Sequence, residues 1–196
     1  MTHIENIPHI LQYGITHINS KNKNPSYKTI GDTSLISTRD LFSLPDKTVL
    51  GDYIPFYFGP RMPMLYVMQK GYNGVVATNP EDIVYCISSI QKITDYNLKY
   101  LFTDGHAVDS YSSYFDSNDI VNIKTIVDFQ AVKATYWRDD SDLDLKRRKE
   151  AEFLLSQDFP PDAIIGYCVY NDTTKKQLLS YGIDSNKIQV KPDYYF

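Results

Sequence analysis

The segment LGDYIPFYFGPRMPMLY (50–66) decides the fold class, because two kinds of element follow each other closely within it. Residues 53–58 are aromatic and β-branched, and they predict a strand that ends at Gly59 and Pro60. The apolar run 62–68 follows at once and predicts a helix or an extended piece after Pro63. Short strands mixed with short helices in this way are typical of an α+β fold.

The same irregular mixture continues along the chain in both directions. Short apolar, β-branched and aromatic runs predict further strands at 83–87, 100–103, 167–170 and 188–190. No regular alternation of strand and helix connects them, so we expect an α+β architecture and not a doubly wound sheet.

The predicted helices are short. Asn6 is a candidate N-cap for a first helix, and another helix is predicted to begin near Asp95. Residues 143–151 are charged and helix-like, and Asp172 can cap a helix over 173–181.

Residues 18–48 are polar and rich in turn formers, and they predict a long loop with one turn of helix near Leu35. Loops longer than about 15 residues are usually either functional or disordered. This one carries Tyr27, Ile30 and Ile36, so we expect it to be ordered and functional.

Composition narrows the class of protein. The chain has 196 residues, 42% of them hydrophobic, which predicts one domain (1–196) with a real core. A formal net charge of −4 excludes a highly basic protein that coats nucleic acid without specificity, but it permits a local basic patch. No apolar run of about 18 residues and no signal-peptide pattern occurs, so we expect no membrane span and a cytoplasmic protein.

Common catalytic and metal motifs are absent from the sequence. It has no phosphate-binding loop, no dinucleotide fingerprint, no zinc-protease motif and no serine-hydrolase elbow. Two cysteines, Cys86 and Cys168, are too few for a disulfide framework, and no metal site is expected. Three features remain: a histidine-rich start beside a polar loop, an aromatic segment ending in Pro-Arg-Met-Pro, and a basic stretch that runs into a glutamate.

Together these segments resemble the DarT family, bacterial toxins that ADP-ribosylate a base of single-stranded DNA. The similar runs occur in family order and cover nearly the whole chain: THIENIPHILQYGI (2–15), IGDTSLISTR (30–39), LGDYIPFYFGPRMPMLY (50–66), LFTDGHA (101–107), TYWRDD (135–140), RRKEAEFLL (147–155) and DYYF (193–196). The resemblance implies an ADP-ribosyltransferase-like fold, in which two small sheets with surrounding short helices form a cleft for NAD.

The resemblance assigns catalysis to Glu152 and Arg39. A carboxylate that grips the ribose hydroxyls can stabilise the positive charge that develops when nicotinamide leaves. From the residues alone, Glu152 would instead pair with Arg148 on one helix, and Arg39 with Asp32 or Asp40. An arginine is a poor proton acceptor, so we expect Arg39 to hold phosphate or developing negative charge, while a role in proton transfer stays open.

The remaining site residues also follow from the resemblance. Thr2 and His3 match the NAD-binding start of the family, and His9 and His17 have weaker claims to the same role, beside Arg39. Contacts to DNA, or to the target base, are expected from Tyr57, Arg61, His106 and Lys146.

The predicted function is therefore transfer of ADP-ribose from NAD to a base of single-stranded DNA, with thymine favoured over guanine and with no metal. The family also implies a macrodomain antitoxin (DarG-like) as a partner. Two alternative functions are also compatible with the sequence. One is an NAD-dependent transferase that acts on RNA or protein, and the other is a non-enzymatic module that binds single-stranded nucleic acid through its tyrosines.

Overall fold

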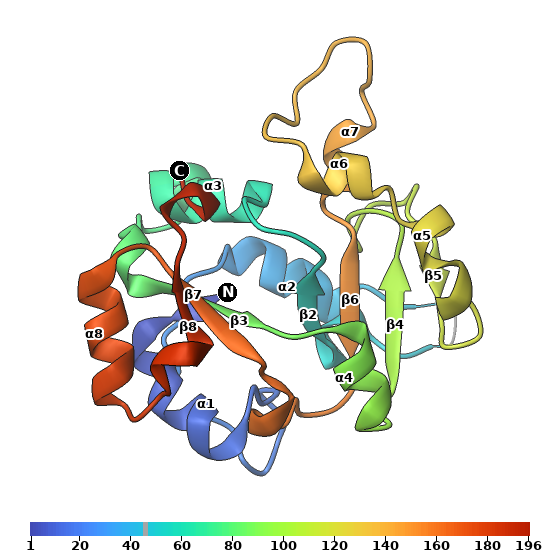
Figure 1. Cartoon of the computed structure of the whole chain (residues 1–196). Coiled ribbons are helices and arrows are strands. Elements are labelled where there is room, and N and C mark those ends of the chain that lie inside the picture. Colours follow the sequence, from blue (N-terminus) through green and yellow to red (C-terminus); the bar gives the residue numbers. More distant parts are fainter. Residues whose placement is uncertain (45–46) are drawn as a thin grey trace. The chain divides into compact units, whose positions relative to one another are not determined.

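Two four-stranded sheets organise the chain, and each belongs to its own compact unit (Figure 1). The computed structural model describes residues 1–44 and 47–196, so positions 45 and 46 of the predicted loop lie outside it. The first unit comprises Met1–Asp32, Leu65–Leu98 and Gln157–Phe196. The second comprises Thr33–Met64 and Lys99–Ser156.

The sheet of the first unit has the strand order β1-β3-β7-β8. Its strands are β1 (Thr2–His3), β3 (Ile83–Ile87), β7 (Gly166–Val169) and β8 (Ile188–Val190). Strands β1, β3 and β7 are antiparallel neighbours, whereas β7 and β8 are parallel. A parallel pair needs a crossover, which helix α8 (Asp172–Ser180) supplies.

Short helices surround this sheet. They are α1 (Ile7–Tyr13), α4 (Ile90–Asp95) and the part of α3 (Pro63–Lys70) from Leu65 onward. Single 3-10 turns connect the elements: η1 (Ile4–Asn6), η3 (Tyr72–Gly74), η4 (Pro80–Asp82), η6 (Pro161–Ala163), η7 (Ser185–Lys187) and η8 (Pro192–Tyr194). Gly14 ends α1 at φ +82°, and a Cβ there would overlap the Phe159 carbonyl, so only glycine fits.

The sheet of the second unit is antiparallel throughout, in the order β2-β6-β4-β5. Its strands are β2 (Ile54–Tyr57), β6 (Glu152–Leu155), β4 (Tyr100–Thr103) and β5 (Tyr114–Phe115). Every residue of β6 is buried, as expected of a central strand covered on both faces. The second unit also contains α2 (Thr33–Leu41), α5 (Ile123–Ile126), α6 (Phe129–Lys133), α7 (Leu145–Lys149), η2 (Leu50–Asp52) and η5 (Ile120–Asn122).

The α+β class and the two small sheets are confirmed. Strands over 83–87, 100–103 and 188–190 are confirmed to the residue. The apolar run after the Pro-Arg-Met-Pro turn is the helix α3.

Some predicted elements are wrong in position or kind. The loop 18–48 holds a nine-residue helix, α2, and not a single turn. Asp95 ends α4 instead of beginning it, because the Ser89 hydroxyl caps that helix by accepting from the Lys92 N–H. Asn171, not Asp172, caps α8.

No helix in the described ranges is long and apolar enough to cross a membrane. Both cysteines are free thiols on neighbouring strands, where Cys86 lies opposite Tyr167 and Cys168 opposite Tyr85.

Candidate functional site

Glu152 is the first residue of the central strand β6, and its side chain is only 1% exposed. On one side it lies opposite Tyr57, the last residue of β2. On the other side the backbone pairing with β4 ends one residue further along β6, at Phe153. A buried carboxylate costs several kcal/mol unless it is paired and hydrogen-bonded, so its partners must offset that cost.

Both oxygens of the Glu152 carboxylate have such partners. Oε2 accepts from Arg39 Nη1 at 2.8 Å, and Oε1 accepts from the backbone N–H of Ala107 at 2.9 Å. The carboxylate is thereby fixed in orientation, with its charge kept in a water-poor site.

Arg39 comes from the last turn of α2 and is 11% exposed. Its partner is Glu152, so the alternative pairing with Asp32 or Asp40 is wrong. The second terminal nitrogen, Nη2, is buried and has no hydrogen-bond partner among residues 1–44 and 47–196. An unpaired guanidinium donor in such a place points to a negatively charged or strongly accepting ligand.

The turn after β4 supplies the remaining support for Glu152. The hydroxyl of Thr103 accepts from the Glu152 backbone N–H at 3.0 Å and donates to the Gly105 carbonyl at 2.5 Å. Two residues on, Ala107 gives its N–H to the carboxylate. Thus one buried hydroxyl fixes both the start of β6 and the turn that contacts its side chain.

Arg147 holds the same turn from outside. Its Nη1 lies 3.2 Å from Asp104, and its carbonyl accepts from the His106 N–H at 2.9 Å. A Cβ on Gly105 would come within 2.3 Å of Arg147 Nη1, so the glycine allows this close approach.

Two further predicted residues lie beside Glu152. His106 Nε2 is 4.0 Å from Oε1, and burial lowers the pKa of this imidazole, so the ring is neutral at pH 7. Burial and the charge of Glu152 raise the pKa of the Tyr57 phenol well above its usual range. The site therefore keeps one neutral imidazole and one neutral phenol next to a carboxylate.

Glu150 lies just before this strand as the C-cap of α7, and it is 5% exposed. Burial, with the nearby Glu152 charge, raises the pKa of Glu150 to about 7. Lys146 Nζ lies 3.9 Å away and opposes that rise. Lys149 is buried, donates to the Val132 carbonyl at 3.0 Å, and has its pKa lowered by burial to about 8.

Arg148 does not pair with Glu152, so that alternative is wrong as well. The strand places Glu152 away from α7, and Arg148 instead contacts the carboxylates of Asp128, Asp142 and Asp144. Asp128 precedes α6, whereas Asp142 and Asp144 lie at the end of the loop 134–144, which projects beyond α6 and α7 in Figure 1.

Arg61 follows Pro60 in the turn between β2 and α3, with φ +54°. A non-glycine residue in this left-handed region costs roughly 1–3 kcal/mol and is typical of functional sites.

The other four predicted residues belong to the first unit. Thr2 and His3 form β1, and the His3 imidazole accepts from the Glu5 N–H at 3.1 Å. His17 lies in a turn, where its N–H donates to Asp158 and its Nδ1 accepts from the Asn19 N–H. Those contacts give His17 a structural role at this turn.

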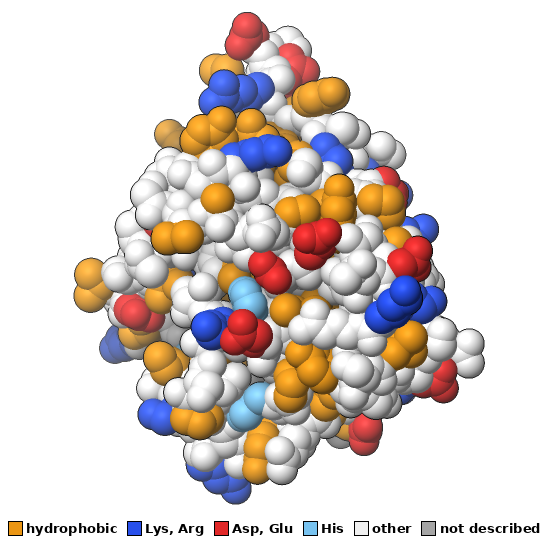
Figure 2. All heavy atoms as spheres, turned by 90° about the vertical axis from the view of Figure 1, so that its left-hand side faces the viewer, with side chains coloured by type: hydrophobic (Ala, Val, Ile, Leu, Met, Phe, Trp, Pro, Cys, Tyr) orange, Lys and Arg blue, Asp and Glu red, His pale blue; other side chains and the backbone are white. Residues whose placement is uncertain are grey.

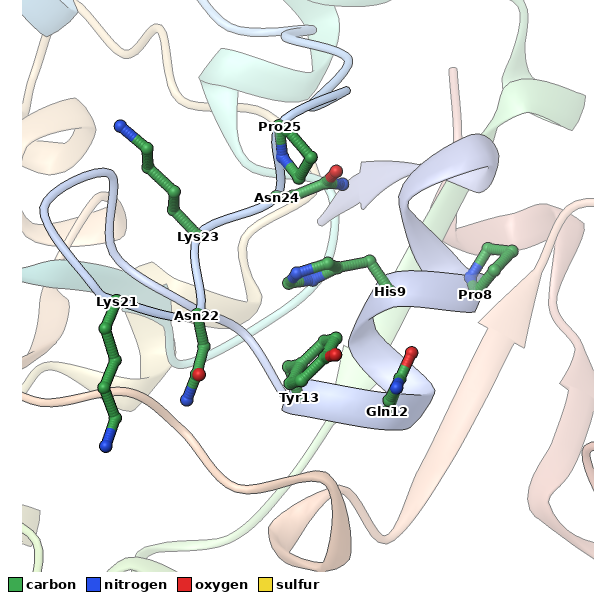
Figure 3. Close-up of a pocket in the computed structure, with 9 residues that line it drawn as sticks. All are labelled: Pro8, His9, Gln12, Tyr13, Lys21, Asn22, Lys23, Asn24 and Pro25. Carbon is green, nitrogen blue, oxygen red and sulfur yellow. The ribbon is translucent and has the colours of Figure 1, made fainter.

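His9 lines an open pocket of about 510 Å³ between α1 and residues 21–25. Figure 3 shows His9 projecting from α1 toward that segment with the Tyr13 ring beside it, whereas Lys23 extends away from His9. The two rings lie 4.9 Å apart. Aromatic rings beside the amides of Gln12, Asn22 and Asn24 suit a base or another planar polar group.

The structure thus brings together Glu152, Arg39, His106 and Tyr57, and it places Lys146 against Glu150 nearby. Sequence reasoning missed the roles of Thr103 and Ala107, although both stand in the run LFTDGHA. Among the described residues no group of three or more histidine, cysteine or acidic side chains could hold a metal ion.

A family model described as DarT, ssDNA thymidine ADP-ribosyltransferase, matches residues 1–196. The DNA ADP-ribosyl transferase of Thermus sp. strain 2.9 is 33% identical over 91% of this chain and 83% of its own length. The one from Escherichia coli O127:H6 is 30% identical over 100% of this chain and 91% of its own length. A Thermosipho africanus DNA ADP-ribosyl transferase–DNA ADP-ribosyl glycohydrolase fusion protein is 32% identical over 100% of this chain and 48% of its own length.

Solved structures of DarT proteins are also similar to this chain. Thermus sp. 2.9 DarT in complex with ADP-ribosylated ssDNA has a TM-score of 0.85 and 29% identity, covering 100% of this chain and 93% of that one. The same protein in complex with NAD+ has a TM-score of 0.80 and 28% identity, covering 100% and 94%.

Proposed function

The chain belongs to the DarT family, and from this premise we propose that it transfers ADP-ribose from NAD to a thymine base of single-stranded DNA. The observation that carries the proposal is the buried carboxylate of Glu152, held by Arg39 and by the Ala107 N–H. A binding module gains nothing from a buried negative charge near DNA phosphates, whereas a transferase needs one.

NAD, as substrate, supplies an ADP-ribosyl group joined to a good leaving group, nicotinamide. Each oxygen of Glu152 accepts one hydrogen bond from the protein and keeps lone-pair capacity for a ribose hydroxyl. Its negative charge stabilises the positive charge that grows on the ribose as the bond to nicotinamide breaks. Because both protein contacts are already made, this carboxylate needs little reorganisation during the reaction.

Arg39 fits a negatively charged substrate through its unpaired Nη2. We assign it to hold a phosphate of NAD or the negative charge that develops on the base. Thr2, His3 and His9 are assigned to NAD binding, and the pocket beside His9 has room for a heterocyclic base. His17, whose N–H donates to Asp158 and whose ring accepts from the Asn19 N–H, is the weakest of these assignments.

Tyr57 offers an aromatic face for an extruded base, while Arg61 and Lys146 are assigned to phosphates beside it. Thymine attacks through a ring nitrogen that must lose a proton. Arginine is protonated at pH 7 and cannot accept it, but the imidazole of His106 is neutral and lies 4.0 Å from Glu152. We therefore propose that the His106 imidazole accepts the proton that the thymine ring nitrogen loses.

The biological setting follows from the family. We propose that residues 1–196 act together as one transferase domain in the cytoplasm. We also propose that a macrodomain antitoxin opposes this chain, since the Thermosipho fusion protein joins a DNA ADP-ribosyl transferase to a DNA ADP-ribosyl glycohydrolase.

Intact-mass analysis of a single-stranded DNA pool mixed with the protein and NAD tests the proposal. The expected result is a gain of one ADP-ribosyl group on DNA, with fragmentation placing it on thymine. A product on guanine would overturn the base assignment alone. If nicotinamide is released but no DNA product forms with any DNA sequence in the pool, the proposed acceptor is wrong.

A further inference from the structure

The side-chain amide of Asn6 is fully buried and makes four hydrogen bonds. Its Nδ2 donates to the Thr2 hydroxyl at 3.0 Å and to the Lys28 carbonyl at 2.9 Å. Its Oδ1 accepts from the Lys28 N–H at 2.8 Å and from Asn24 Nδ2 at 3.4 Å. An amide has two donors and two acceptor positions, so this side chain is used to capacity.

These bonds are not those that the sequence predicts for Asn6. Directly before α1 it has the position of an N-cap, yet its side chain makes no capping bond. It pairs instead with both the N–H and the carbonyl of Lys28, as a neighbouring strand would. The local helix therefore gives up a cap, commonly worth about 1 kcal/mol, in favour of contacts 22 residues away.

Asn6 joins two parts of the first unit that the proposed function uses. One is Thr2, whose hydroxyl oxygen accepts from Asn6 and whose side chain also hydrogen-bonds Tyr27, so that Asn6 helps to fix a residue assigned to NAD binding. The other is the segment 24–28, whose residues Asn24 and Pro25 line the pocket beside His9 (Figure 3).

The opposite end of the same loop is also fixed. Asp158 accepts from the His17 N–H at 3.0 Å and from the Ser20 hydroxyl at 2.5 Å. Residues 21–25, the pocket wall, thus lie between two anchored points. Anchoring both ends of a loop reduces the conformational entropy that a ligand must remove on binding.

We propose that Asn6 is a positioning residue for NAD: it holds Thr2 and the pocket wall in their binding arrangement before NAD arrives. This inference rests on the proposed function. Because Asn6 itself does not touch the reacting atoms, its loss should weaken binding of substrate and transition state alike. The KM for NAD then rises while kcat changes little.

The test compares Asn6→Ala with Asn171→Ala. Asn171 is also an asparagine of the first unit, and its side chain bonds the Thr174 N–H and Glu81. We expect both substitutions to lower Tm, but only Asn6→Ala to raise the KM for NAD, by roughly tenfold with kcat within about twofold. Amide hydrogen exchange at Lys28 should accelerate in Asn6→Ala alone.

If Asn6→Ala does not fold, Asn6→Asp replaces it, since aspartate keeps the size and the acceptor but lacks both N–H donors. An unchanged KM for NAD in a folded Asn6 variant, or an equal rise in Asn171→Ala, would overturn the inference. Should the wild-type protein modify no DNA, the proposed function fails. The role of Asn6 is then decided by calorimetric titration with NAD, where an equal Kd in the wild type and the variant overturns it.

Discussion

Among single residues, Arg61 combines a strained backbone with a proposed role in DNA binding. Its left-handed backbone, with φ +54°, would suit glycine better. Strained backbone of this kind clusters at functional sites, and it is consistent with the proposed contact between Arg61 and a DNA phosphate.

Arg61→Gly should therefore separate stability from binding. We expect its free energy of unfolding to be no lower than that of the wild type, because glycine relieves about 1 kcal/mol of strain. The Kd for single-stranded DNA should rise by about five- to tenfold in a fluorescence-anisotropy titration. The matched control is Lys47→Gly, which relieves a residue at φ +70° outside the proposed contacts and should leave the Kd unchanged. Wild-type affinity in Arg61→Gly would contradict the assignment.

Glu150 makes a prediction about pH. Its folded pKa of about 7 lies above the ordinary value near 4.5, so on raising the pH the unfolded chain loses this proton first. The contribution of protonated Glu150 to the free energy of unfolding is thus fully present below about pH 4.5, and it is lost as the pH rises through 7. Glu150→Gln cannot ionise, and we expect it to raise the free energy of unfolding by up to about 3 kcal/mol at pH 8 and by almost nothing at pH 4.5.

Urea unfolding at both pH values measures this difference. The exposed residue Glu5 provides the control, since Glu5→Gln should change stability by less than about 0.5 kcal/mol at either pH. An equal effect of Glu150→Gln at pH 4.5 and pH 8 would show that ionisation of Glu150 is not coupled to folding.

Single residues differ in how far the sequence predicts them. Glu152 and Arg39 are 113 positions apart, and only the family resemblance singles them out, because spacing alone favours local ion pairs for both. Asn6 is visible in sequence only as a helix cap. Its real partners depend on a long-range contact that no local pattern encodes.

At the scale of elements, the junction of β4 and β6 places the site. Backbone pairing between these strands ends at Phe102 and Phe153, so the N–H of Glu152 needs another acceptor. The Thr103 hydroxyl provides it and also binds the Gly105 carbonyl. The buried side chain of Thr103 thus takes the place of a backbone acceptor between the two strands.

Thr103→Val keeps the shape of this side chain and removes both bonds. We expect a loss of about 2 kcal/mol in stability, because two buried backbone groups lose their partner, and at least a tenfold loss of kcat for transfer. Thr174→Val is the matched control: Thr174 is also buried, and its hydroxyl donates to the Glu81 carbonyl in the first unit. If both variants lose stability and kcat equally, Thr103 has no particular role at the site.

Elements with a strong pattern were predictable and the others were not. The run 83–87 is apolar and the run 188–190 alternates apolar with polar; both are short and bounded by polar residues, and they form strands β3 and β8. Helix α2 is rich in serine and threonine and buries no residue, so its sequence lacks an apolar stripe. Strand β6 follows a basic helix without a turn-forming residue, which hides its start at Glu152.

At the scale of the whole molecule, charge limits how DNA can bind. The net charge is −4, and on the face shown in Figure 2 acidic and basic side chains are interspersed. Binding must therefore rest on a few local contacts, of which Arg61 and Lys146 are the proposed ones.

The salt dependence of DNA binding should accordingly be shallow. For two or three phosphate contacts to a single strand, the slope of log K against log salt concentration is about −1.5 to −2. Lys146→Met should reduce its magnitude by about 0.7, measured by anisotropy titrations from 50 to 300 mM salt. A slope steeper than about −5 would mean that a much larger basic surface is engaged.

In the proposed mechanism, Glu152 stabilises the transition state of ADP-ribosyl transfer to DNA. The most direct test is the initial rate of DNA modification, followed by intact mass, for the wild type and Glu152→Gln at saturating NAD. Glutamine keeps the size and an oxygen acceptor but removes the negative charge, so we predict a loss of roughly 10²–10³-fold in kcat with NAD and DNA still bound. A Glu152→Gln rate within a fewfold of the wild type would contradict the claim.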